Sequence, residues 1–97
     1  MHARQTTLQV DPSRVDEVIR TFREQVIPII RQQGGRGARL LADRRSGKVH
    51  VISLWESTEA LQAAESTLNQ QRDQARQQLG ATSATTEVFE VAVMEDF

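Results

Sequence analysis

The residues best suited to acid-base chemistry are His50 and Asp43, which lie on either side of a tight turn. Histidine titrates near neutral pH, so an imidazole held by a carboxylate can act as a general base. If two strands fold back at Ser46 and Gly47, their pairing places Asp43 and His50 on the same face. We therefore identify His50 as the candidate catalytic base. The favoured alternative is a histidine that pairs with this carboxylate in a protein interface.

Trp55 is the only tryptophan of the chain and stands where the second of these strands meets the following helix. The mouth between a sheet and its helices is a place where small apolar ligands bind. We hypothesise that Trp55 contributes to such a pocket. The alternative, which is the commoner fate of a lone aromatic side chain, is that the ring only fills the core.

Composition excludes several kinds of chemistry and of partner. The 97 residues contain no cysteine, so disulfides, thiol nucleophiles and zinc-thiolate sites are absent. The two histidines have no carboxylate cluster beside them, so we expect no metal, and we expect no cofactor. A net charge of -1 argues against a nucleic-acid partner, and the longest apolar run, residues 26–30, is far below the ~20 residues of a membrane span. With no signal peptide visible, we expect a cytoplasmic protein.

Hydrophobic patterning predicts the elements that position these residues. We expect a strand over residues 2–10, and a helix that starts at residues 11–13 and ends at residues 34–35. A hairpin over residues 40–55 follows, then a helix from its cap Ser57 to Gly80, a loop over 81–86 and a last strand over 87–94. This β-α-β-β-α-β order is the ferredoxin-like α+β plan, an antiparallel sheet with both helices on one face, in a single domain over residues 1–97.

Two features of the predicted helices bear on function. Pro28 has no N–H for the carbonyl of Glu24, so we expect a kink there, either as simple curvature or as a widened gap between helix and sheet. In the second helix, Arg72 and Arg76 are suited to an anion, but we interpret them as part of a solvated face.

Both faces of the strand after the turn are apolar. Val49, Val51 and Trp55 occupy one face, and Ile52 and Leu54 occupy the other. A chain of this length has helices for one face only, so the second face predicts a partner, most simply another copy of the chain. An even-numbered turn gathers the residues of this second face into the predicted homodimer interface: Arg39, Leu41, Asp43, His50, Ile52 and Leu54.

The stretch over residues 40–61 resembles the dimeric α+β barrel superfamily, and within it the antibiotic biosynthesis monooxygenase-like domains. The shared features are a strand, a tight turn with Gly47, a strand that ends at Trp55, and then a helix. The resemblance implies a dimeric α/β barrel, in which the sheets of two copies pack face to face. It also implies a pocket in which cofactor-free enzymes hold an aromatic polyketide while the substrate itself activates oxygen.

The resemblance also suggests which residues line the pocket. Trp55 matches the pocket tryptophan of these enzymes, and we expect it to line a substrate pocket together with Ser53 and Thr6. The position four residues before the tryptophan, often asparagine in these enzymes, is Val51 here. Haem-degrading relatives use an asparagine on the first strand and a histidine on the second helix; here Thr6 stands near the first place, and residues 58–80 contain no histidine.

Two functions follow as expectations. The first is a small-molecule pocket protein, in the form of a cofactor-independent monooxygenase that acts on an apolar aromatic compound, polyketide- or quinone-like. The alternative is a non-catalytic stress-response or accessory protein whose only activity is its dimer. An RNA-binding version of the same topology is rejected, because that class needs exposed aromatic residues on the two central strands.

Overall fold

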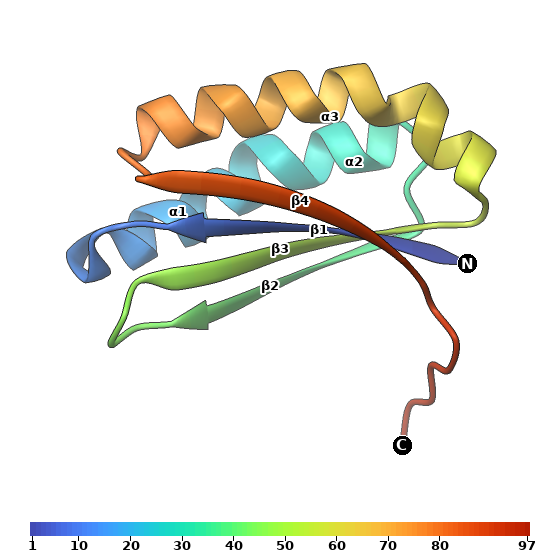
Figure 1. The fold of residues 1–97 in the computed structure, drawn as a ribbon, viewed down its shortest axis with the longest axis horizontal. Helices are drawn as coiled ribbons and strands as arrows, with labels where there is room; N and C mark the ends of the chain where they lie inside the picture. Colours follow the sequence, from blue (N-terminus) through green and yellow to red (C-terminus); the bar gives the residue numbers. More distant parts are fainter.

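Four strands pair into one antiparallel sheet in the computed structural model, which describes residues 1–97, and the helices lie on one face of it (Figure 1). The strands are β1 (His2–Gln9), β2 (Gly37–Asp43), β3 (Lys48–Trp55) and β4 (Ser83–Glu90). The helical segments are η1 (Pro12–Arg14), α1 (Val15–Thr21), η2 (Phe22–Val26), α2 (Ile27–Gln32) and α3 (Thr58–Gln78). Because the strands lie in the order β2-β3-β1-β4, the predicted ferredoxin-like plan is confirmed.

The helices begin and end at the predicted signals. Asp11 accepts a hydrogen bond from the backbone N–H of Ser13 at 2.9 Å, and Gly34 adopts a φ of +92° just after α2. The hydroxyl of Ser57 accepts from the backbone N–H of Ala60 at 3.1 Å and caps α3. No helix of the chain has both the length and the apolar character that crossing a membrane requires.

Pro28 disturbs the first helix by widening one turn. The segment η2, which joins α1 to α2, is π-helical, and the N–H of Ile27 donates to the carbonyl of Phe22. This turn directly precedes Pro28, whose missing N–H removes one bond of the regular ladder. The helix stays continuous through the irregular turn (Figure 1), and Val26 and Ile30 on either side of Pro28 face the sheet.

The hairpin between β2 and β3 turns where the sequence predicts it. Gly47 adopts a φ of +80°, and its carbonyl accepts from the N–H of Val10 at 3.0 Å. A Cβ atom at this position would collide with the carbonyl oxygen of Val10, so only glycine fits. On the other side of the turn, Asp43 accepts from the backbone N–H of Arg45 at 2.9 Å.

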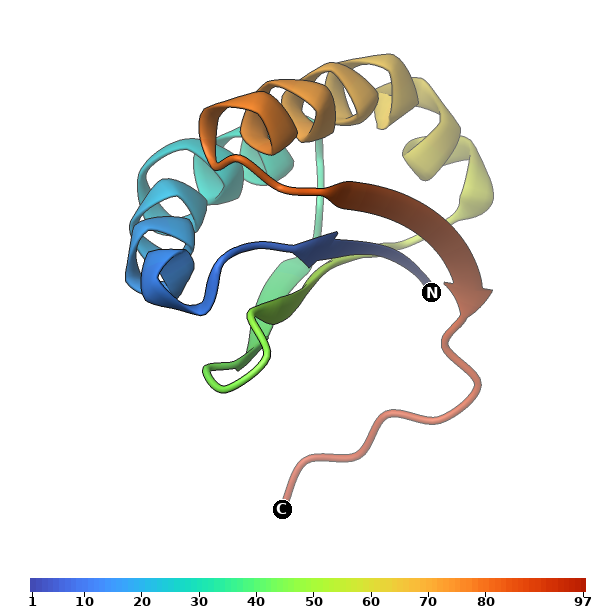
Figure 2. The ribbon, with the colours of Figure 1, turned by 60° about the vertical axis from the view of Figure 1, so that its left-hand side comes forward.

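The last strand lies earlier in the chain than predicted. β4 spans Ser83–Glu90, whereas alternation predicted a strand over residues 87–94 after a loop over 81–86. Strand β4 pairs with β1 from Ser83 opposite Gln9 to Glu90 opposite His2. Because β1 begins at His2, residues 91–97 have no strand to pair with, and they leave the sheet on the side away from the helices (Figure 2).

The core between sheet and helices consists of two separate clusters. One cluster contains Leu8, Val10, Val15, Val18, Val49, Ala75, Leu79 and Ala81. The other contains Ile30, Trp55, Leu61, Ala64 and Leu68. The rungs of β1 and β3 between these clusters carry three buried polar side chains: Arg4, Thr6 and Ser53. Polar positions therefore divide the core into two halves.

The strand pairing confirms the predicted division of the sheet into two faces. Leu41 stands opposite His50 and Arg39 opposite Ile52, and alternation turns all four side chains to the face without helices. Figure 2 shows this uncovered face below the sheet, opposite the helices. Leu41 is 52% exposed on it, and Phe89 of β4 is 48% exposed.

Candidate functional site

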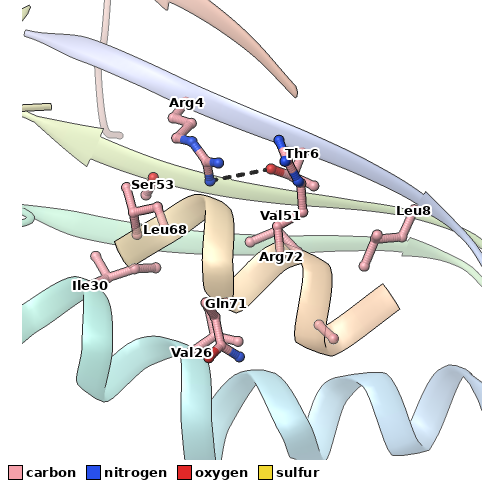
Figure 3. A pocket seen from close by; sticks show the side chains of 11 residues that line it. Arg4, Thr6, Leu8, Val26, Ile30, Val51, Ser53, Leu68, Gln71 and Arg72 are labelled. Carbon is pink, nitrogen blue, oxygen red and sulfur yellow. Dashed lines mark hydrogen bonds between the residues drawn. The ribbon is translucent and has the colours of Figure 1, made fainter. Parts of the chain in front are cut away.

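A cavity of about 50 Å³ lies between the two halves of the core. Its apolar wall comes from Leu8, Val26, Ile30, Val51, Leu68 and Ala75, and its polar wall from Arg4, Thr6, Ser53, Gln71 and Arg72. Figure 3 shows these side chains projecting from β1, β3 and the helices into one space. An apolar cavity of about 150 Å³ accepts one benzene ring. A planar ligand therefore enters this site only when the lining side chains move apart.

Of the three expected pocket residues, Thr6 and Ser53 line the cavity and Trp55 does not. Trp55 is completely buried in the core, where its indole N–H donates to the hydroxyl of Ser53 at 2.8 Å. The ring thus lies behind the cavity wall, in the cluster that includes Ile30 and Leu68. Trp55 orients the Ser53 hydroxyl, whose own proton stays available for another acceptor.

His50 lies on the opposite face of the sheet from the cavity. Its Nδ1 forms a hydrogen bond with the hydroxyl of Thr7 at 2.9 Å. The expected pairing with Asp43 is wrong, because Asp43 stands opposite Lys48 and accepts from the turn instead. These bonds, the backbone N–H of Arg45 first among them, hold the pKa of Asp43 below its ordinary value. His50 therefore lacks the orienting carboxylate and the access that a base for this cavity would need.

Two arginines that were not among the expected site residues face the cavity. Arg4 is 7% exposed, and its guanidinium donates to the hydroxyl of Thr6 at 3.4 Å and to the amide oxygen of Asn69 at 2.8 Å. Arg72 donates to the hydroxyl of Thr86 at 3.1 Å, and this hydroxyl lies 3.2 Å from that of Thr6. Two threonine hydroxyls therefore link the two guanidinium groups.

The interpretation of Arg72 as part of a solvated face is wrong, whereas Arg76, one turn further, is exposed. The side chain of Arg72 is only 24% exposed. A signal for this was present, because Arg72 follows Leu68 by four residues and precedes Ala75 by three, so it continues the apolar stripe of α3. Likewise, Arg4 lies on the same face of β1 as the buried residues Thr6 and Leu8, two and four positions further along.

The cavity carries an excess of positive charge. Burial lowers the pKa of Arg4, and the charge of Arg72 acts in the same direction, while the charge of Glu65 opposes them. Arg4 takes part in none of the four ion pairs of the chain, and Arg72 is paired only with its exposed neighbour Asp73. Negative charge brought into the cavity would therefore be stabilised.

The lining defines what the site can do chemically. It contains no histidine, cysteine or carboxylate, so it supplies neither a general base nor a metal ligand of those types. No group of three or more such residues elsewhere in the chain is placed to hold a metal ion. The polar wall can instead bind and orient an acceptor group, and can lower the pKa of an acidic group on a ligand.

Comparison with known proteins assigns the family. The family model of the antibiotic biosynthesis monooxygenases matches residues 1–76, so the chain belongs to this family. A curated relative, the uncharacterized protein Rv2557 of Mycobacterium tuberculosis strain H37Rv, is 35% identical over 95 residues. The match covers 97% of this chain and 42% of that protein, so the chain spans about two fifths of the relative's length.

Solved structures share the fold. The heme-degrader MhuD of Mycobacterium tuberculosis, with two hemes bound in its active site, has a TM-score of 0.75 and 23% identity, and the match covers 99% of this chain and 100% of that one. The monooxygenase of ActVA-Orf6 of Streptomyces coelicolor, in complex with Nanaomycin D, has a TM-score of 0.68 and 20% identity, with 98% and 92% covered. At these identities the likeness establishes the fold alone.

Proposed function

We propose that the protein binds a planar aromatic compound, polyketide- or quinone-like, between its sheet and its helices, and oxygenates it as a cofactor-independent monooxygenase. The observation that carries this proposal is the interruption of the core by a cavity that joins apolar and polar walls. Burying polar groups costs stability. A chain of 97 residues buries only a small hydrophobic core. We therefore expect polar side chains to interrupt this core where they bind a ligand.

The family and its structures support a small organic ligand. The monooxygenase of ActVA-Orf6 holds Nanaomycin D on the same fold. Haem, the ligand of MhuD, is less well matched here, because iron is held by histidine, cysteine, methionine or tyrosine. None of these residue types lines the cavity, and α3 contains no histidine.

In the proposed reaction the substrate supplies all the electrons. A substrate methylene and O₂ give a carbonyl and water; one oxygen atom enters the product, and the other leaves with the two hydrogens. The protein binds the deprotonated substrate, whose negative charge Arg4 and Arg72 stabilise, and its apolar wall excludes water. The lining holds no base. One substrate proton therefore leaves to solvent when the substrate ionises, and the departing oxygen atom takes a proton back from solvent as it forms water.

Trp55 provides the test, because a ligand beside Ser53 changes the hydrogen bond that the indole makes. Trp55 emission is followed while planar phenols, hydroquinones and quinones are titrated, with oxygen uptake recorded in the same samples. Saturable quenching together with oxygen consumption is the expected result. Quenching without oxygen consumption would show that the protein binds these compounds but does not oxygenate them. No response to any compound from the folded protein would contradict the proposal and favour the accessory dimer.

We also propose that the uncovered face of the sheet forms a homodimer interface. Its residues are those expected from the sequence: Arg39, Leu41, Asp43, His50, Ile52 and Leu54. The support is physical: the helices cover only the other face, and Leu41 and Phe89 leave about half of their surface exposed here. A second copy of the same face would cover these side chains.

A further inference from the structure

We infer that the ligand of this cavity is an organic anion, a planar apolar body with one ionised oxygen group, carboxylate or enolate, held between Arg4 and Arg72. The inference rests on the proposed binding function of the cavity, and it names the chemical class of the ligand. Three features of the site support it: its hydrogen-bond donors, its charge and its apolar wall.

The polar wall has more hydrogen-bond donors than acceptors. A guanidinium has five N–H groups and accepts nothing. Arg4 uses two of them, on Thr6 and Asn69, and Arg72 uses two, on Thr86 and a neighbouring carboxylate. Three N–H groups of each arginine are therefore left without an acceptor in the protein.

The hydroxyl groups add to this surplus. Thr6 and Thr86 each receive an N–H from an arginine, and of the two hydroxyls only one can donate to the other, so one proton is left over. Ser53 accepts from Trp55 and keeps its own proton as well. A neutral apolar ligand offers these donors no acceptor inside the cavity, whereas an ionised oxygen group can accept from them in charge-assisted hydrogen bonds.

The charges favour the same class of ligand. Arg4 is buried without an ion pair, and the positive charge of Arg72 acts on it. Glu65 acts on Arg4 in the opposite sense, but it is exposed on α3 and does not line the cavity. An anion between the two guanidinium groups relieves their repulsion and supplies the missing counter-charge.

The rest of the wall selects the body of the ligand. Val26 and Ile30 from the first helix and Val51 from β3 line the same cavity as the arginines (Figure 3), and Arg4 and Arg72 are the only charged side chains of the lining. An inorganic anion would leave this apolar wall without contacts. A flat hydrocarbon body with its ionised group at one end meets both walls.

Two matched pairs of probes test the inference. 2-Naphthoate and 2-naphthamide share a planar body and differ in charge, as do 2-hydroxy-1,4-naphthoquinone, in its ionised form, and neutral 2-methoxy-1,4-naphthoquinone. Affinities are measured by calorimetry on the full chain. We expect the charged member of at least one pair to bind ten times more tightly than its neutral partner, which is about 1.4 kcal/mol. The pair that shows the preference identifies the ionised group as carboxylate or enolate.

Arginine variants locate the effect. Arg72→Gln should weaken binding of the preferred anion at least tenfold and leave its neutral partner unchanged, and Arg4→Gln should do the same. Arg76→Gln, on the exposed side of α3 one turn further, is the matched control and should change neither affinity. Arg72→Lys should recover part of the preference because it keeps the charge. The part-exposed position of Arg72 keeps the test valid if Arg4→Gln fails to fold.

Three outcomes would overturn the inference. Equal affinities within both pairs, unchanged by Arg72→Gln, would reject the anion and leave the proposed binding function standing. Binding of none of the four probes by the folded protein would reject both. If Arg72→Gln lowers the affinity for the charged and the neutral probes equally, this side chain shapes the cavity and its charge does not select the ligand.

Discussion

One hydrogen bond, from the indole N–H of Trp55 to the hydroxyl of Ser53, connects a core side chain to a side chain of the cavity wall. Ser53→Ala leaves the fully buried indole N–H without an acceptor, so we expect a loss of about 1–3 kcal/mol in the free energy of unfolding, measured by urea denaturation. Ser53→Thr keeps the hydroxyl and should lose less. A loss below a few tenths of a kcal/mol in Ser53→Ala would show that the indole N–H is satisfied in another way.

Individual residues of the site were only partly predictable from the sequence. Thr6 and Ser53 were expected from the resemblance to the family, and they line the cavity. Arg4 lies on the same face of β1 as Thr6 but was not expected at the site, since charged side chains are almost never fully buried. Arg72 was assigned to solvent for the same reason. Each guanidinium donates to an acceptor that is distant from it in sequence, Arg4 to Asn69 and Arg72 to Thr86.

At the scale of the elements, the hairpin depends on one glycine. Gly47→Ala forces a side chain into the left-handed region and against the carbonyl of Val10, so we expect a loss of more than about 2 kcal/mol in stability. Gly34→Ala is the matched control, because Gly34 has a similar φ but no atom near its Cβ position. It should lose about 1 kcal/mol. Equal losses in urea denaturation would contradict the close approach at Gly47.

The same hairpin predicts a pH dependence through Asp43. Hydrogen bonds from the turn, chiefly the backbone N–H of Arg45, keep the pKa of Asp43 below its ordinary value in the folded protein. The charged form therefore adds stability above the unfolded pKa of about 4, and this stability is lost as the pH falls through the lower folded value. In thermal unfolding between pH 7 and pH 2, Asp43→Asn should be less stable than the wild type at pH 7, and the difference should disappear in acid. A difference independent of pH would contradict this account.

Most elements were predictable because local signals agreed with the final packing. The caps at Asp11 and Ser57 and the glycines at positions 34 and 47 set ends that the structure keeps. The last strand was misplaced by four residues at each end, since residues 91–94 continue the alternating pattern of β4. Its end is set by the length of its partner β1, which is a property of the pairing and not of the local sequence.

At the scale of the whole molecule, the open face of the sheet predicts an oligomer. Leu54→Asp or Ile52→Asp places a charge in the proposed interface and should give monomers or insoluble protein in size exclusion with light scattering. Gln74→Asp, at an exposed position of α3, is the control and should leave the dimer unchanged. A soluble protein of unchanged size in both interface variants would contradict the assignment of this face.

The overall topology and the family could be recognised from one hairpin and the order of the elements, because few topologies satisfy that order. The ligand could not be predicted in this way. Its cavity arises from the division of the core into two clusters, which depends on the packing of three helical segments over two central strands.

The central claim is that the cavity between sheet and helices is the ligand site. The most direct measurement is a titration of the ¹⁵N-labelled protein with 2-naphthoate, followed by the shifts of the backbone amide signals. We predict that the shifts concentrate at Thr6, Ser53 and Gln71, which line the cavity, and spare Leu41 and His50 on the uncovered face. Shifts concentrated on the uncovered face, or no shifts at saturating ligand, would contradict the account.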